Sequence, residues 1–111
     1  MIVALHSVLK DGAEAEYTRE HQRIPDDLAA SFERIGIHDW TIWRSGRDLF
    51  HLVDCDDYVA AMQALVGDPA DEAWQARIGV YVDHFVGEED GPSGQMLPRV
   101  WRLREQTGRT E

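Results

Sequence analysis

Two residues in the first quarter of the sequence have the side chains and the spacing for proton transfer. Tyr17 and His21 lie four positions apart, so on a helix both side chains would extend from one face. Histidine exchanges protons near neutral pH, and a tyrosine hydroxyl can donate and accept hydrogen bonds. We predict that this pair handles protons in a catalytic site. The same spacing also fits a core histidine with a satisfied hydrogen bond, and that alternative stays open.

Flat aromatic side chains could complete such a site. The sequence has four tryptophans, at positions 40, 43, 74 and 101. The face of an indole ring packs well against the C–H surface of a sugar ring, while the sugar hydroxyls bond to other groups. We predict that Trp40 and Trp74 contact the ligand, and we expect the Trp74 ring to be exposed because it lies near the start of a helical pattern. Core packing is the competing explanation for each of them.

Other residue combinations for catalysis are weaker. The remaining histidines, at positions 6, 38, 51 and 84, lack the close spacing of a zinc site. No glycine-rich phosphate loop joins a strand to a helix, and neither the serines nor Cys55 have an evident activating partner. We therefore predict no metal, no cofactor and no covalent intermediate.

The strand and helix that would position the pair follow from the hydrophobic pattern. Residues 2–9 are apolar and rich in β-branched side chains, which predicts a central buried strand. A helix should begin at Gly12 or Ala13, because apolar side chains then recur along one face. They are Tyr17, His21, Ile24, Leu28, Phe32 and Ile35. Pro25 has no N–H to bond the carbonyl of His21, so we expect a bend beside His21.

A β-hairpin is predicted after this helix. Residues 37–44 and 48–54 are strand-like, and the sequence Ser-Gly-Arg between them favours a turn. If the first two of these turn residues form the loop, cross-strand counting places Trp40 opposite His51 on the same face of the hairpin.

A pair of helices and a last strand complete the predicted order. Asp56 can cap the first helix of the pair, and the second helix should run over residues 70–86. The glycine-rich and acidic residues 87–94 predict a mobile connection. Residues 96–103 are apolar and aromatic enough for a final strand, which Pro98 would confine to an edge or a bulge.

This order of elements is that of an α+β protein with a ferredoxin-like split βαβ arrangement and an antiparallel sheet. The helices can cover only one face of such a sheet, so the other face would expose a large apolar patch in a monomer. We therefore predict a homodimer joined through the sheets, of the dimeric α+β barrel type. Residues 1–103 would form one domain, and the polar residues 104–111 a C-terminal tail.

Composition narrows the class of ligand. The chain has 111 residues, of which 43% are hydrophobic and 29% charged, as in an ordinary globular domain. Its formal net charge of −10 repels nucleic acid and anionic lipid, so we expect neither as a partner and predict a neutral ligand. The single cysteine, the absence of a signal peptide and the absence of a long apolar stretch predict a cytoplasmic protein without a membrane segment.

These residues together resemble the L-rhamnose mutarotase family over roughly residues 2–103. The resemblance rests on the run Glu16-Tyr17-Thr18-Arg19-Glu20-His21 with Pro25, on His38-Asp39-Trp40-Thr41-Ile42-Trp43, on Leu49-Phe50, and on Trp74. Family members are dimeric ferredoxin-like enzymes of carbohydrate metabolism that interconvert the α and β anomers of L-rhamnose without a cofactor. The resemblance therefore implies an isomerase acting on a neutral monosaccharide, L-rhamnose or a related deoxysugar.

The resemblance also implies roles for individual residues. His21 matches the histidine taken as the proton donor, and Tyr17 matches a tyrosine that contacts the sugar. Trp40 stands where the family commonly has a substrate-contacting tyrosine. Trp74 matches the first residue of a Trp-Trp pair, whose second residue is Gln75 here. This departure replaces a stacking face by an amide and leaves the identity of the sugar open.

Two other classes of function fit the same scaffold. A cofactor-free oxygenase or decarboxylase acting on an aromatic compound would also use an apolar pocket with one histidine. A non-catalytic protein that binds a small ligand would contain His21 only as a buried side chain. The fold alone does not distinguish these functions.

Overall fold

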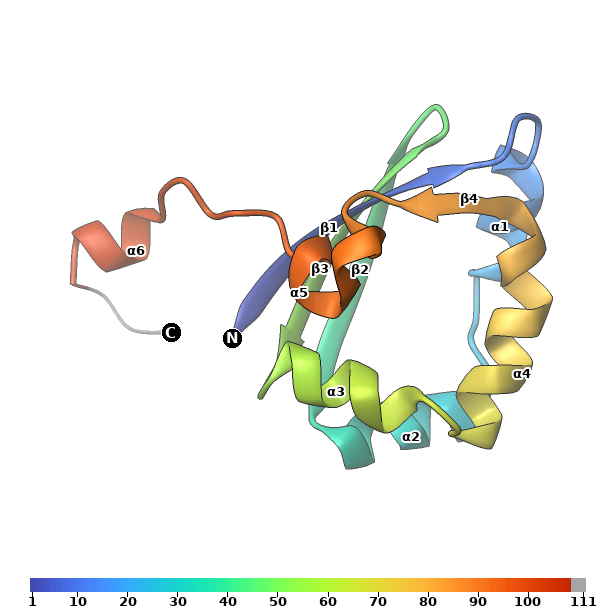
Figure 1. Cartoon of the computed structure of the whole chain (residues 1–111), viewed down its shortest axis with the longest axis horizontal. Helices are drawn as coiled ribbons and strands as arrows, with labels where there is room; N and C mark the ends of the chain where they lie inside the picture. Colours follow the sequence, from blue (N-terminus) through green and yellow to red (C-terminus); the bar gives the residue numbers. More distant parts are fainter. Residues whose placement is uncertain (109–111) are drawn as a thin grey trace.

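A single antiparallel sheet forms the centre of the computed structural model of the chain, which describes residues 1–108 (Figure 1). Its strands are β1 (Ile2–Leu9), β2 (Ile37–Ser45), β3 (Asp48–Cys55) and β4 (Val82–Phe85), in the spatial order β2-β3-β1-β4. The helices are α1 (Glu14–Glu20), α2 (Asp26–Ile35), α3 (Tyr58–Leu65), α4 (Pro69–Ile78), α5 (Gly91–Gln95) and α6 (Leu103–Gln106). This confirms the predicted α+β class and the ferredoxin-like split βαβ arrangement.

The two faces of the sheet differ in what covers them. On the inner face, alternate side chains of β1 and β3 are buried against the helices, as period-two alternation requires. On the outer face, Trp43, Phe50 and Leu52 are 55%, 41% and 40% exposed. The predicted apolar outer face is therefore present.

The predicted first helix is interrupted rather than bent. Helix α1 ends at Glu20 with His21 as its C-cap, and α2 begins only at Asp26, after Pro25. A proline disfavours helical geometry in the residue before it and cannot donate a backbone hydrogen bond. The prediction of one bent helix was thus wrong, and His21 lies at a helix end beside an irregular segment.

The hairpin has a different register from the predicted one. Ser45 pairs with Asp48, so the loop is Gly46 and Arg47, and Trp40 lies opposite Val53 while Ile42 lies opposite His51. The shift amounts to two positions, and since strand side chains alternate with a period of two, Trp40 still lies on the face predicted for it.

The second half of the chain corrects three further predictions. The helix predicted over 70–86 ends at Ile78, and Val82–Phe85 instead forms β4 on the free edge of β1. The helical spacing of the aromatic side chains in 70–86 concealed the β-branched residues at its end, which suit a strand. No strand forms over 96–103, where the Leu97 N–H donates one hydrogen bond of 2.9 Å to the Ala4 carbonyl. Helix α3 is capped by Asp57 and not by Asp56.

The segment after β4 is more structured than predicted. It contains the 3₁₀ turn η2 (Glu88–Asp90) and helix α5, and Tyr58 in α3 donates a 3.1 Å hydrogen bond to Gln95 in α5. Helix α6 crosses the predicted boundary between domain and tail at residue 103. Of the predicted tail, residues 109–111 lie outside the described residues, so the division of the chain stays a prediction.

Candidate active site

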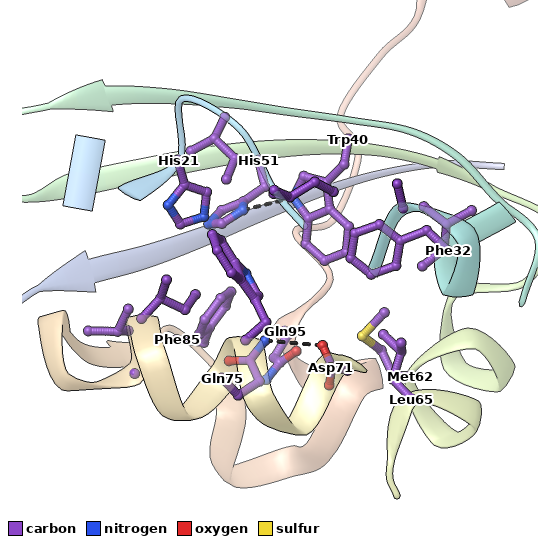
Figure 2. A pocket seen from close by; sticks show the side chains of 18 of the residues that line it. His21, Phe32, Trp40, His51, Met62, Leu65, Asp71, Gln75, Phe85 and Gln95 are labelled. Carbon is purple, nitrogen blue, oxygen red and sulfur yellow. Dashed lines mark hydrogen bonds between the residues drawn. The ribbon is translucent and has the colours of Figure 1, made fainter. Parts of the chain in front are cut away.

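A cavity of about 1150 Å³ lies between the inner face of the sheet and the helices (Figure 2). Its lining includes all five residues that the sequence singled out, namely Tyr17, His21, Trp40, Trp74 and Gln75. These residues come from the three elements α1, β2 and α4 and from the break after α1. The fold therefore brings the predicted site residues together, while their roles stay predictions.

His21 contacts Tyr17 and Trp74 through its ring, and it bonds the backbone of Tyr17 through Nδ1. Its Nδ1 lies 3.2 Å from the Tyr17 carbonyl oxygen, and because a carbonyl only accepts, Nδ1 carries a proton. The His21 ring stacks on the Tyr17 ring at 4.1 Å and meets the Trp74 ring edge-on at 5.0 Å. In the neutral imidazole Nε2 then holds the lone pair, and no group among residues 1–108 forms a hydrogen bond with it.

Burial makes His21 more acidic than an ordinary histidine. Desolvation lowers its pKa, and the hydrogen bond to the Tyr17 carbonyl and the charge of Glu20 partly oppose this effect. Neutral imidazole, with a free lone pair on Nε2, is therefore the main form at neutral pH.

Tyr17 faces His21 through its ring and not through its hydroxyl. The two rings are inclined by only 30°, and the bond between the residues runs from the imidazole to the backbone carbonyl. Tyr17 is 4% exposed, and burial raises the pKa of its hydroxyl far above the usual value. The hydroxyl thus stays protonated and can donate or accept a hydrogen bond without becoming a phenolate base.

Trp74 is held in place by contacts between α1 and α4. The Arg77 guanidinium lies 5.5 Å from the centre of the Trp74 ring and pairs with Glu20, the residue before His21. Trp74 lies in the middle of α4 and is 5% exposed, so the expectation of an exposed ring at a helix start was wrong. Its ring nevertheless lines the cavity.

A second histidine lines the cavity on the sheet side. His51 accepts a 3.0 Å hydrogen bond at Nδ1 from the Trp40 indole, and its Nε2 lies 2.9 Å from Ser7 Oγ. Burial, followed by the charges of His21 and His6, lowers the pKa of His51 to about 4. Sequence reasoning placed His51 on the same hairpin face as Trp40 but considered it for function only as a weak metal ligand. Its place among the alternating core residues of β3 was the signal that could have identified it as a site residue.

Polar side chains lie on the opposite side of the cavity, beside the apolar Met62 and Leu65 (Figure 2). The Gln75 amide donates a 3.4 Å hydrogen bond to Asp71 on the same helix, and Gln95 lies nearby on α5. Burial raises the pKa of Asp71, assisted by the charges of Asp68 and Glu72 and opposed by the Gln75 bond. The cavity thus has an aromatic wall on the sheet and hydrogen-bonding groups on the helices, an arrangement that suits a ligand with both C–H faces and hydroxyls.

Two structural features bear on other classes of function. Among residues 1–108, no group of three or more histidine, cysteine, aspartate or glutamate side chains is arranged to hold a metal ion. The described helices include none with the length and apolar character that crossing a membrane requires.

Comparison with solved structures supports the fold. An L-rhamnose mutarotase from Formosa agariphila superposes with a TM-score of 0.71 at 15% identity, covering 93% of this chain and 98% of that one. Tetracenomycin F2 cyclase from Streptomyces glaucescens, a type-II polyketide cyclase, gives 0.63 at 16% identity, covering 93% and 96%. A NIPSNAP domain protein from Burkholderia xenovorans gives 0.52 at 21% identity, covering 77% and 87%. At these identities the likeness shows a shared fold only, and it does not by itself indicate a shared activity.

Sequence comparison identifies the family. No curated protein sequence matches the chain at a significant level. The sequence profile of the L-rhamnose mutarotase family, however, matches residues 3–103, which confirms the resemblance inferred from Tyr17, His21 and the tryptophans. The chain therefore belongs to the L-rhamnose mutarotase family.

Proposed function

We propose that the protein is an aldose mutarotase, an isomerase that interconverts the α and β anomers of L-rhamnose or a related deoxysugar. The observation that carries this proposal is the state of His21. Its Nδ1 proton is engaged by the Tyr17 carbonyl, its Nε2 is available, and its ring lines a cavity with aromatic and hydroxyl-binding walls. Family membership supports the same activity.

Mutarotation requires two proton transfers, which His21 can assist. In the opening step, neutral His21 accepts the proton of the anomeric hydroxyl at Nε2 while the bond between the anomeric carbon and the ring oxygen breaks. The ring oxygen takes a proton from water, the Tyr17 hydroxyl can donate a hydrogen bond to the sugar without losing its proton, and the free aldehyde rotates. Closure on the other face of the carbonyl reverses both transfers. General acid-base assistance of this kind contributes on the order of 10² to 10⁴ in rate.

The sugar is positioned by the two walls of the cavity. Trp40 and Trp74 offer ring faces to the C–H surface of the pyranose, and Tyr17 offers a neutral hydroxyl. Gln75 offers its amide to a sugar hydroxyl in place of the stacking face common in the family. We therefore propose Tyr17, Trp40, Trp74 and Gln75 as substrate-binding residues and His21 as the catalytic acid and base.

NMR saturation transfer between the α and β anomeric protons of L-rhamnose tests this function. We expect the protein to accelerate exchange, and we expect His21→Ala to abolish the acceleration. His6→Ala is the matched control, because His6 bonds Asp48 and does not line the cavity. Equal exchange rates with and without protein, for L-rhamnose, L-fucose and other deoxysugars alike, would refute the proposal.

A homodimer joined through the outer faces of the sheets is part of the proposal. Trp43, Phe50 and Leu52 form an apolar patch there, and an exposed patch of this kind favours association. We expect light scattering with size exclusion to give twice the chain mass, and Trp43→Glu to give a monomer. A monomeric wild-type protein at micromolar concentration would contradict this part.

The cytoplasm is the compartment that we propose for the reaction. Cys55 is a free, buried thiol, which suits a reducing compartment. Cell fractionation should recover the protein with soluble cytoplasmic enzymes, and recovery outside the cell would contradict the assignment.

A further inference from the structure

Three side chains form a hydrogen-bonded chain across the sheet, beside the residues already assigned. Ser7 on β1, His51 on β3 and Trp40 on β2 are linked by bonds of 2.9 Å and 3.0 Å. Ser7 is 0% and His51 3% exposed, so water competes little for these bonds.

The chemistry of the donors fixes the protonation state of His51. An indole N–H can only donate, so Nδ1 of His51 must hold a lone pair to accept from Trp40. The ring proton of the neutral imidazole is then on Nε2, from which it is donated to Ser7 Oγ. Both nitrogens of His51 are therefore engaged, and His51 could exchange a proton with a ligand only by losing one of these bonds.

The bond to His51 also determines where the Trp40 ring lies. The hairpin register places Ile42 opposite His51, so the Trp40 indole reaches its partner diagonally across the strands. Phe32 stacks on the indole at 5.8 Å, and Phe85 lies 5.3 Å from the His51 ring on the other side. These ring contacts allow sliding, whereas the hydrogen bond defines one orientation of the indole.

We propose that His51 is a positioning residue, which in its neutral Nε2–H form holds the Trp40 indole in the orientation that makes the sugar-stacking wall of the cavity. This inference rests on the proposed function in one respect, namely that Trp40 contacts the sugar. His51 differs in this from His21, which has one nitrogen engaged and acts on the substrate with the other.

A pair of substitutions separates positioning from packing. His51→Phe keeps an aromatic ring of similar size and removes both nitrogens, so the Trp40 N–H loses its acceptor. His51→Asn provides an amide oxygen near the Nδ1 position and should restore that acceptor. Ser7→Ala is the matched control, because it removes the partner of Nε2 and leaves the bond to Trp40 in place. Thermal unfolding of each variant establishes that it is folded.

Nitrogen NMR of the free protein provides the first readout, and it does not depend on any activity. We expect His51 to be neutral at pH 7 with its proton on Nε2, and the indole N–H signal of Trp40 to shift in His51→Phe and to return toward its wild-type position in His51→Asn. A proton on Nδ1, a charged His51, or an indole signal that His51→Phe leaves unchanged would overturn the inference, even if the wild-type protein catalyses no sugar reaction.

Exchange kinetics provide the second readout. Loss of one hydrogen bond that orients a binding face corresponds to a rise in KM on the order of 3- to 10-fold. We expect this rise in His51→Phe with kcat nearly unchanged, and a partial recovery in His51→Asn. A large fall in kcat at constant KM would instead assign proton transfer to His51 and would overturn the positioning role.

Discussion

Acidification should destabilise the folded protein through His51, and replacing this residue should remove the effect. Burial and the neighbouring charges lower the pKa of His51 to about 4, against an ordinary value of 6.5. At about 1.4 kcal/mol for each pKa unit, this difference corresponds to about 3 kcal/mol of unfolding free energy. Because the side chain is 3% exposed, solvent screening reduces this figure little.

The sign follows from which state binds the proton. Between pH 6.5 and about 4 the unfolded chain carries a proton on His51 and the folded chain does not. The contribution to stability is therefore fully present above pH 6.5 and is lost progressively as the pH falls toward 4. Protonation in the folded state would also place an N–H on Nδ1 against the indole N–H of Trp40, two donors facing each other.

Urea unfolding followed by tryptophan fluorescence measures this effect. The unfolding free energy is compared at about pH 7.5 and about pH 4.5 for the wild type and for His51→Asn. Carboxylates titrate in both proteins, so their contributions cancel in the difference between the two pH dependences. We expect the wild type to lose about 2 to 3 kcal/mol more than the variant on acidification. Equal losses in the two proteins would refute the lowered pKa and the buried, neutral state of His51.

Three other predictions concern the wall and the acid-base group of the site. Burial lowers the pKa of His21, and the proposed reaction starts from its neutral imidazole, so kcat/KM should fall on acidification with a midpoint below pH 6.5. A midpoint above that value would contradict the proposed role of His21. Gln75→Trp should lower the KM for L-rhamnose by roughly fivefold in saturation-transfer kinetics, because it adds a stacking face, and a raised KM would argue for a different sugar. Trp74→Ala should cost about 3 to 5 kcal/mol in urea unfolding, because the ring is 5% exposed, whereas Trp101→Ala, at 64% exposure, should cost less than about 1 kcal/mol.

The parts of the fold that the sequence predicted correctly are those governed by local pattern. Residues 2–9 and the hairpin have strand patterns that the sheet preserves, and the class of fold followed from the order of the elements. The sequence pattern of residues 70–86 is compatible with both a helix and a strand. In the structure the helix ends at Ile78, and a strand then forms because it can pair with the free edge of β1. The spacing of apolar residues alone does not show whether such a segment continues as a helix or pairs with a free sheet edge as a strand.

The candidate site was predictable to the extent that its residues share one helix face or one strand face. Tyr17 and His21 lie one turn apart and do meet, through stacked rings. The hydrogen bond from Trp40 to His51 depends on the register of the hairpin, which was predicted two positions away from the observed one. Hydrogen-bond partners that depend on strand register or on tertiary packing cannot be predicted from the sequence pattern. These partners determine which nitrogen of a histidine carries the proton.

His21 and His51, two of the histidines that line the cavity, show why hydrogen-bond partners matter more than residue type. His21 caps the end of α1, at the start of the helix break before Pro25, where Nδ1 bonds a backbone carbonyl and Nε2 has no hydrogen-bond partner among the described residues. His51 lies inside the sheet, where a donor occupies one nitrogen and a hydroxyl the other. Because burial lowers both pKa values, charge alone does not distinguish them. The free nitrogen of His21 does distinguish them, and it is the reason why we propose proton transfer for His21 and the positioning of Trp40 for His51.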